Sequence, residues 1–400
     1  MSTTYDRTFF VHGLREALDF WFPACVDEKF GGFNTSLDRF GNVINPDKSV
    51  WFQGRSAWTL AMAYRDFFPE PQFLDWARAG LEFLERRCFD SDGRMFFTVT
   101  EDGKPLRKRR YVFSECFAIL AMAAFAQASG ESAWRDRAWE IFQFTNRCLN
   151  EPGVLEPKVS PETRPMRGLG TPMILLNVAS ELRRAFQDGT SEGSVRISEL
   201  NQIIDGYLHD IETFHWKPEF DCLLETVGEN GEFLDTFDGR QINPGHSMEA
   251  AWFTLAEARF RENDTHLKEL GLKILNASWR WGWDAKFGGM LYFRDCRNLP
   301  CTEYWHDMKF WWPHCETLIA QLMAWHMTGE NTYRERFEQT ADWTFSHFPD
   351  PRPDGGGEWF GYPHRDGTLS VDLKGNLFKG PFHIPRMFAV CAGLESSPTF

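Results

Sequence analysis

The stretch that decides the fold is residues 118–128, AILAMAAFAQA, which is apolar on every side when it is wound as an α-helix. Residues 171–179 (TPMILLNVA), 250–258 (AAWFTLAEA) and 316–325 (ETLIAQLMAW) have the same character. A helix that is apolar all round is stable only where other elements cover it completely. These segments therefore predict an inner layer of helices that a second layer shields from water.

The shielding layer is predicted by segments that carry a charged stripe beside an apolar one, such as DWARAGLEFLERR (75–87) and YRERFEQTADWTF (333–345). Such a pattern is typical of a helix with one face in water. The two kinds of helix alternate along the chain, which predicts outer and inner helices in pairs. We place twelve helices at residues 7–22, 50–67, 71–87, 112–129, 131–149, 169–186, 193–213, 245–262, 264–283, 307–329, 331–348 and 381–394.

A short segment rich in glycine, aromatic and β-branched residues recurs between the members of each pair. Its copies are 60 to 70 residues apart and are marked by Gly32, Gly93, Gly153, Leu223, Gly289 and Gly357. Six similar units predict an all-α fold, an (α/α)6 barrel (toroid) of six helix hairpins with short β-hairpins at one mouth. An open solenoid is the competing arrangement, but its end units would carry polar caps, which the sequence lacks.

No linker-like segment divides the chain. The proline-rich stretch that starts at Pro349 falls inside the sixth unit, where we expect a loop. We therefore expect residues 1–400 to form a single (α/α)6-barrel catalytic domain.

The composition excludes several classes of partner. The formal net charge of −14 argues against nucleic acid and against an anionic membrane, since both require a basic surface. No stretch approaches the ~20 apolar residues of a membrane span, and the start does not resemble a signal peptide, so we expect a cytoplasmic protein. The chain has 38 Phe and 17 Trp, a surplus that favours a sugar ligand stacked on aromatic rings.

The nine cysteines are dispersed and include no C-x-x-C pair, which argues against a zinc or redox site. Reduced and buried thiols are the expected state. Cys315 is the one candidate for a reactive thiol, because it lies between His314 and Glu316.

Polar residues recur at one position of each unit, the start of the inner helix. In a closed ring all these starts face the same end, so they converge on one mouth, where free helix N–H groups favour sugar hydroxyls and enolate oxygens. His246, His314 and His383 share this position, and Glu249 and Glu316 follow two of them closely. No H-E-x-x-H motif and no pair of histidines four residues apart is present, so we predict no metal.

With these residues in view, the chain resembles the N-acylglucosamine 2-epimerase family over nearly its whole length. The resemblance is carried, in the family's order, by VWFQGR (50–55), VFSECF (112–117), PGHSME (244–249), KFWWPHCE (309–316) and KGNLFKGPFHIPR (374–386). The family's fold is an (α/α)6 barrel, in agreement with the repeat count. The motifs are more similar to the N-acylglucosamine branch than to the related cellobiose 2-epimerases and mannose isomerases.

The resemblance implies an isomerase and assigns its residues. His246 and His383 correspond to the family's acid/base pair. Six further residues correspond to its substrate-binding pocket: Arg55, Asn177, Glu249, His314, Glu316 and Arg386. The resemblance also implies chemistry without a required cofactor, ATP as an allosteric activator, and a homodimer. No G-x-x-x-x-G-K-[ST] loop is present from which a nucleotide site could be placed.

The implied reaction interconverts N-acyl-D-glucosamine and N-acyl-D-mannosamine by removing and returning a proton at C2 of the open-chain sugar. Two bases on opposite faces suit this reaction, and histidine can be both acid and base near neutral pH. An aldose–ketose isomerase of the mannose/fructose type would return the proton to C1, and a cellobiose 2-epimerase would act on a disaccharide. Sequence alone separates these three activities poorly.

Two more distant alternatives use the same toroid. A glycoside hydrolase would need two carboxyl groups as acid and base, for which Glu115, Glu249 and Glu316 are candidates. A sugar-binding protein without catalytic activity would bind the ligand and leave it unchanged.

Overall fold

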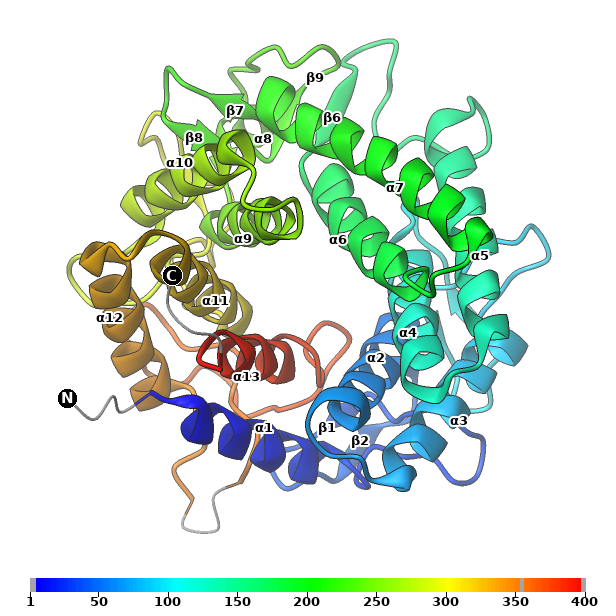
Figure 1. Cartoon of the computed structure of the whole chain (residues 1–400). Coiled ribbons are helices and arrows are strands. Elements are labelled where there is room, and N and C mark those ends of the chain that lie inside the picture. The colour runs from blue at the N-terminus through cyan, green and yellow to red at the C-terminus, as the bar shows by residue number, and fades with distance from the viewer. Residues whose placement is uncertain (1–4, 353–355, 397–400) are drawn as a thin grey trace.

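The computed structural model describes residues 5–352 and 356–396, so part of the expected proline-rich loop lies outside the described residues. Within these ranges, helices alternate between an outer and an inner ring (Figure 1). The outer ring is α1 (Arg7–Trp21), α3 (Pro71–Arg87), α5 (Ser132–Asn150), α7 (Ser191–Asp210), α10 (Thr265–Gly282) and α12 (Asn331–His347). The inner ring is α2 (Val50–Asp66), α4 (Phe113–Ser129), α6 (Gly170–Ala185), α9 (Pro244–Phe260), α11 (Trp311–Thr328) and α13 (His383–Leu394). The predicted (α/α)6 barrel is confirmed.

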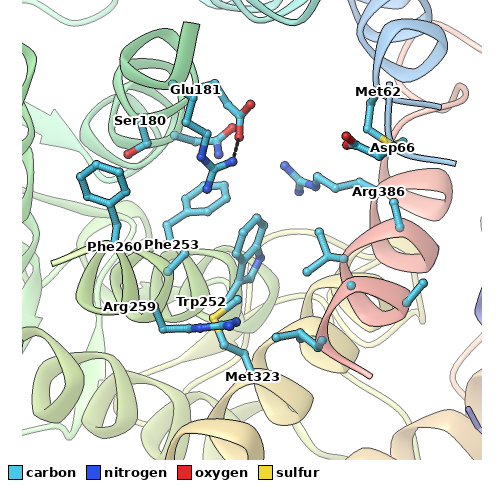
Figure 2. Close-up of a pocket in the computed structure, with 18 of the residues that line it drawn as sticks. Met62, Asp66, Ser180, Glu181, Trp252, Phe253, Arg259, Phe260, Met323 and Arg386 are labelled. Carbon is cyan, nitrogen blue, oxygen red and sulfur yellow. Dashed lines mark hydrogen bonds and ion pairs between the residues drawn. The ribbon is translucent and has the colours of Figure 1, made fainter. Parts of the chain in front are cut away.

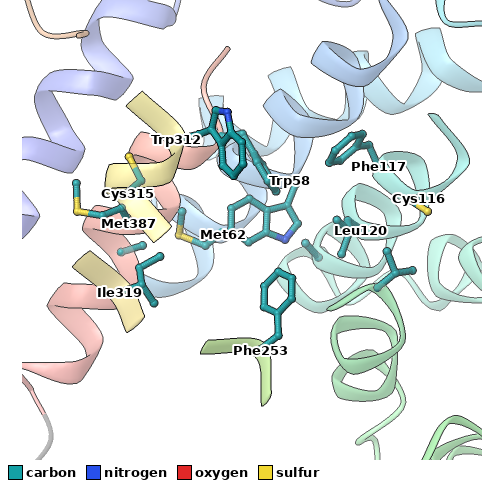
Figure 3. Packing of buried hydrophobic residues seen from close by; sticks show 14 of the residues in the cluster. Trp58, Met62, Cys116, Phe117, Leu120, Phe253, Trp312, Cys315, Ile319 and Met387 are labelled. Atoms are coloured by element: carbon teal, nitrogen blue, oxygen red, sulfur yellow. The ribbon is translucent and has the colours of Figure 1, made fainter. Parts of the chain in front are cut away.

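Burial follows the predicted difference between the two rings. Every residue of α4 from Ser114 to Ala126 is buried, whereas α3 buries only one face. Figure 3 shows side chains from five inner helices packed together, among them Trp58, Phe117, Phe253, Ile319 and Met387. The inner helices therefore fill the centre of the barrel with side chains.

The structure differs from the sequence prediction at two helix ends and in one additional short helix. The helix expected to begin at residue 307 begins at Trp311, because Lys309 instead donates its backbone N–H to Pro363 and its ammonium to Asp284. After α7 the chain continues as a π-helical turn, Ile211–His215. An unpredicted short helix, α8 (Phe237–Arg240), is capped by Thr236.

The short strands pair both within a unit and between neighbouring units. They are β1 (Ser36–Leu37), β2 (Val43–Asn45), β3 (Lys48–Ser49), β4 (Thr98–Val99), β5 (Pro105–Arg107), β6 (Met166–Gly168), β7 (Trp216–Lys217), β8 (Cys222–Leu223), β9 (Thr226–Gly228), β10 (Gln241–Ile242) and β11 (Arg294–Asp295). The pairs β1–β2, β4–β5 and β7–β8 lie within one unit, whereas β3–β4, β6–β9 and β10–β11 each join one unit to the next. All pairs are antiparallel. The strands therefore fix the loops at the mouth to one another around the ring.

A buried Asp–Lys ion pair closes the mouth loop in at least two units. Lys48 Nζ lies 2.6 Å from Asp27 Oδ2, and Lys309 Nζ lies 3.1 Å from Asp284 Oδ2. In each case the aspartate follows the outer helix and the lysine precedes the inner helix. Because both partners are buried, removal of one would leave an uncompensated charge in the loop.

No helix in the part of the chain that the structure describes is long and apolar enough to cross a lipid bilayer. All nine cysteines are free, and only Cys301 is not fully buried. Burial raises the pKa of the Cys315 thiol well above its usual range, which argues against a reactive thiol at this position.

Candidate active site

The inner-helix starts surround a cavity of about 420 Å³, as the repeat pattern predicts. A cavity of this size suits a small-molecule ligand. Its polar and charged lining comes mainly from four helices, with Arg55 on α2, Asn177 on α6, His246 and Glu249 on α9, and His383 and Arg386 on α13. Of the predicted site residues, only His314 and Glu316 do not line it.

His383 is the first residue of α13 and is almost fully buried. Its Nδ1 lies 2.8 Å from Glu316 Oε1. A carboxylate at this distance accepts the Nδ1 proton, which leaves Nε2 as the free lone pair. Burial, together with the positive charges of Arg386 and Arg55, lowers the pKa of His383 well below its usual range. His383 is therefore neutral near pH 7 and suited to act as a base.

His246 has a different environment. Its Nδ1 donates to the carboxylate of Glu225, at 3.0 and 2.9 Å from the two oxygens. Burial lowers the pKa of His246, but the negative charge and the hydrogen bond of Glu225 outweigh burial, with further help from Glu249 and Glu316, so the pKa ends above its ordinary value. The pKa values of the two histidines are therefore shifted in opposite directions. The shift favours the neutral form of His383 and the protonated form of His246.

The indole ring of Trp312 lies close to both histidines. The Trp312 ring centroid lies 5.0 Å from that of His246 and 5.9 Å from that of His383. Further aromatic rings line the cavity, namely Trp51, Phe113, Phe117, Phe253, Tyr292, Trp305, Phe310, Trp311, Tyr362, Phe378 and Phe382. Such walls suit a pyranose or an open-chain sugar, whose C–H faces pack on aromatic rings.

Arg55 presents a positive charge without a counter-ion. Its guanidinium donates to the Phe378 carbonyl at 2.9 Å and lies 4.1 Å from the Phe117 ring centroid. Among the described residues no carboxylate pairs with it, and its Nε is buried without a hydrogen-bond partner. Burial and the charge of Arg386 lower the pKa of Arg55 to about 9, which still leaves it charged at neutral pH. Arg55 is therefore able to bind an oxyanion.

Arg386 binds two carboxylates close to His383. One of its terminal nitrogens lies 2.6 Å from Glu249 Oε1 and 2.7 Å from Glu316 Oε1. The other oxygen of Glu316 accepts from the Trp252 indole at 2.7 Å. Both carboxylate oxygens of Glu316 therefore accept hydrogen bonds, and through them Glu316 positions His383 and Arg386. Glu316 lies beneath the cavity and does not line it.

His314 does not reach the cavity. Its Nδ1 donates to the Phe310 carbonyl at 2.7 Å, and its Nε2 accepts from the Met290 backbone N–H at 2.9 Å. Burial lowers the pKa of His314 to about 3, so the ring is neutral. A Cβ added at Gly289, whose φ is +72°, would lie 2.8 Å from His314 Nε2. His314 therefore ties the fifth mouth loop to α11, a position that the sequence pattern alone did not distinguish from the cavity positions.

Glu249, Glu316 and His383 offer ligand atoms within 4.8 Å of one another, the geometry of a candidate metal site. However, the Arg386 guanidinium already binds both carboxylates. A divalent cation would have to displace this guanidinium, so the donor set does not fit a resident metal.

We expect exhaustive chelation to leave the turnover number unchanged, because Arg386 supplies the positive charge that a metal would bring. The measurement is kcat before and after dialysis against EDTA, with added Mg²⁺, Mn²⁺ and Zn²⁺ as separate arms. Loss of activity on chelation, with recovery on adding one of these ions, would contradict this expectation and make the two glutamates and His383 ligands.

The sequence analysis missed Glu225 and the loop aromatics. Glu225 lies between β8 and β9, in the marker segment of the fourth unit, and its carboxylate two residues after Leu223 was the available signal. Tyr292, Trp305 and Tyr362 also come from mouth loops and not from inner-helix starts. Because they lie outside the inner-helix starts, the recurring pattern of polar residues did not identify them.

Comparison with known proteins gives consistent matches. A sequence profile described as N-acylglucosamine 2-epimerase (GlcNAc 2-epimerase) matches residues 31–382. The N-acylglucosamine 2-epimerase of Bos taurus is 35% identical over 384 residues, which cover 94% of this chain and 88% of the relative. A cellobiose 2-epimerase of Eubacterium cellulosolvens is 23% identical, over 92% of this chain and 94% of the relative. The solved structure of a cellobiose 2-epimerase from Bacillus thermoamylovorans B4167 has a TM-score of 0.80 at 18% identity, over 98% of this chain and all of the other.

Proposed function

The chain belongs to the N-acylglucosamine 2-epimerase family and is an isomerase, and from this premise we propose that it interconverts N-acyl-D-glucosamine and N-acyl-D-mannosamine. The single observation that carries the mechanism is the pair of oppositely poised histidines in one aromatic cavity. The substrate assignment is supported by the higher identity to an N-acylglucosamine 2-epimerase, 35%, than to a cellobiose 2-epimerase, 23%.

The protonation states suggest how the two histidines divide the reaction. Neutral His383 removes the C2 proton of the open-chain aldose through Nε2, and protonated His246 delivers a proton to the opposite face. The C–H electron pair forms the C1–C2 double bond, the carbonyl π pair moves onto the aldehyde oxygen, and this oxygen becomes an enolate oxyanion while the acylamino nitrogen stays on C2. In the reverse direction the two histidines exchange roles, since each ends the first turnover in the other's protonation state.

Arg55 is placed to stabilise the oxyanion. A guanidinium that lacks a counter-ion and is packed against aromatic rings interacts strongly with a charge that develops beside it, because little water screens the pair. Arg55 also lies on α2, across the barrel from His246 on α9 (Figure 1). We infer that it binds the oxygen at C1.

Carboxylate-based hydrolysis fits the site poorly. Arg386 binds both Glu249 and Glu316, and Glu115 accepts from Arg94 at 2.7 Å outside the cavity. A hydrolase needs one protonated and one ionised carboxyl group facing the scissile bond. The candidate carboxylates are instead all paired with arginines, and none is left free to face a scissile bond.

We expect N-acetylmannosamine to have a kcat/KM at least roughly 100-fold above that of mannose. The acyl group fills space that mannose leaves empty, and its methyl group and amide together contribute enough binding energy for such a ratio. The measurement is steady-state kinetics with both sugars and with cellobiose. Rapid conversion of mannose to fructose, with N-acetylmannosamine untouched, would favour the isomerase and overturn the substrate assignment.

We expect Glu225→Gln to shift the alkaline limb of the pH–kcat profile downward by roughly one pH unit. The pKa of His246 is raised, so its acid form is present below that pKa and is lost as pH rises through it. Removing the carboxylate removes the main raising cause, and the acid form is then lost at lower pH. Glu219→Gln, a change of an exposed carboxylate on the neighbouring loop, is the control. An unshifted alkaline limb in Glu225→Gln would contradict this positioning role.

Four finer properties belong to the proposal. The chemistry needs no cofactor, ATP acts only as an activator, the protein forms a homodimer, and it works in the cytoplasm. Titration of ATP into the steady-state assay tests the activation by ATP. Sedimentation of the purified protein tests whether it is a homodimer. The activation by ATP and the homodimer rest on the family resemblance.

A further inference from the structure

A second cavity, of about 680 Å³, lies at the other end of the barrel, where the inner helices end (Figure 2). Residues of the last turns of α2, α6, α9 and α13 line it, including Asp66, Glu181 and Phe260. The mechanism proposed above makes no use of this space. Its volume is in the range of small-molecule sites.

The two cavities share a floor. Asn177, Phe253, Phe382 and Arg386 line both of them. On the active-site side Arg386 binds Glu249, and its Nε is buried without a hydrogen-bond partner. A ligand in the second cavity would therefore lie next to the side chain that helps to position the catalytic groups.

Positive charge is concentrated around this cavity in a protein whose formal net charge is −14. Among the described residues, its lining includes six arginines and three carboxylates. Each carboxylate already pairs with an arginine, as Asp66 does with Arg65, Glu181 with Arg184, and Glu257 with Arg183. The remaining arginines therefore have no carboxylate partner within the lining.

Arg259, in the last turn of α9, is the clearest example of a lining arginine without a carboxylate partner. It is half-buried, and it forms neither an ion pair nor a hydrogen bond with any part of the chain that the structure describes. A helix C-terminus attracts a cation, but Arg259 does not donate to the terminal carbonyls. Figure 2 shows Arg259, Trp252 and Arg386 among the side chains that line the cavity. A partly desolvated charge without a partner is costly, and an anion would compensate it.

We propose that this cavity binds a small organic anion, with its carboxylate or phosphate group on Arg259 and its apolar part against Trp252 and Phe260. Arginine pairs with both kinds of group through its planar fork of N–H donors. The aromatic rings of the lining accommodate the apolar part. The site is separate from the sugar cavity, so both can be occupied together.

The test is calorimetric titration of the full chain with phenyl phosphate and with benzoate, at constant ionic strength. We expect saturable binding of at least one probe, and the stronger probe identifies the anionic group. Benzyl alcohol, which lacks the charge, should not bind. Arg259→Gln should weaken binding about 10-fold or more, the value of a charged hydrogen bond. Arg280→Gln, an equal charge change outside both cavities, should leave it unchanged.

Saturating N-acetylmannosamine should not change the affinity for the probe. Competition by the sugar would place the probe in the active site and overturn the proposal. Absence of saturable binding, or equal weakening in both arginine variants, would also overturn it. Because the readout is binding, the result does not depend on whether the sugar is epimerised.

Discussion

His383→Ala is expected to lower kcat by at least ~100-fold, the scale of general acid–base catalysis. The lost group is the neutral imidazole whose Nε2 faces the cavity, and the Glu316 contact that orients it cannot be replaced by water in the same geometry. His246→Ala should cause a loss of the same order, because the reaction needs one histidine on each face. The measurement is kcat with N-acetylmannosamine at neutral pH.

The control for these two variants is His266→Ala, which removes an exposed histidine paired with Glu212. It should retain the wild-type rate. Circular dichroism and thermal unfolding should show that all three variants are folded. Near-wild-type turnover in either His383→Ala or His246→Ala would remove that residue from the mechanism.

Arg55→Met is expected to lower kcat by roughly 10² to 10³-fold, the range seen when one oxyanion donor is removed. Methionine keeps much of the apolar contact with Phe117 while removing the charge and the donors. KM should change much less than kcat, since the charge on the oxygen is larger in the transition state than in the bound aldose. Steady-state kinetics separates these two parameters.

Two further variants sharpen the test of Arg55. Arg55→Lys keeps the charge and should recover part of the loss. Arg196→Met, which removes an arginine packed on Trp139 outside both cavities, should have no effect on kcat. A variant Arg55→Met that raises KM and leaves kcat unchanged would assign Arg55 to ground-state binding and not to the oxyanion.

The sequence was sufficient for the architecture because the two helix types differ so clearly in polarity. The unbroken burial of α4 and the single buried face of α3 follow directly from their residue patterns. Convergence of the inner-helix starts then follows from ring closure, which is why Arg55, His246 and His383 were found together from positions far apart in the chain.

The sequence could not assign contacts that depend on loop conformation. His314 and His383 both lie at the start of an inner helix, yet the His314 ring is hydrogen-bonded to two backbone groups, whereas His383 faces the cavity. Glu225 contacts His246 only because β9 pairs with β6 of the preceding unit and fixes its loop. Neither difference has a signature in residue spacing, since both depend on the conformation of the mouth loops.

The central claim is that one histidine removes a proton from C2 and the other returns a solvent-derived proton to the opposite face. The most direct measurement is conversion of N-acetylmannosamine in heavy water, followed by NMR of the product. We expect N-acetylglucosamine with one deuterium at C2 and none at C1. N-acetylglucosamine that keeps hydrogen at C2 would contradict it.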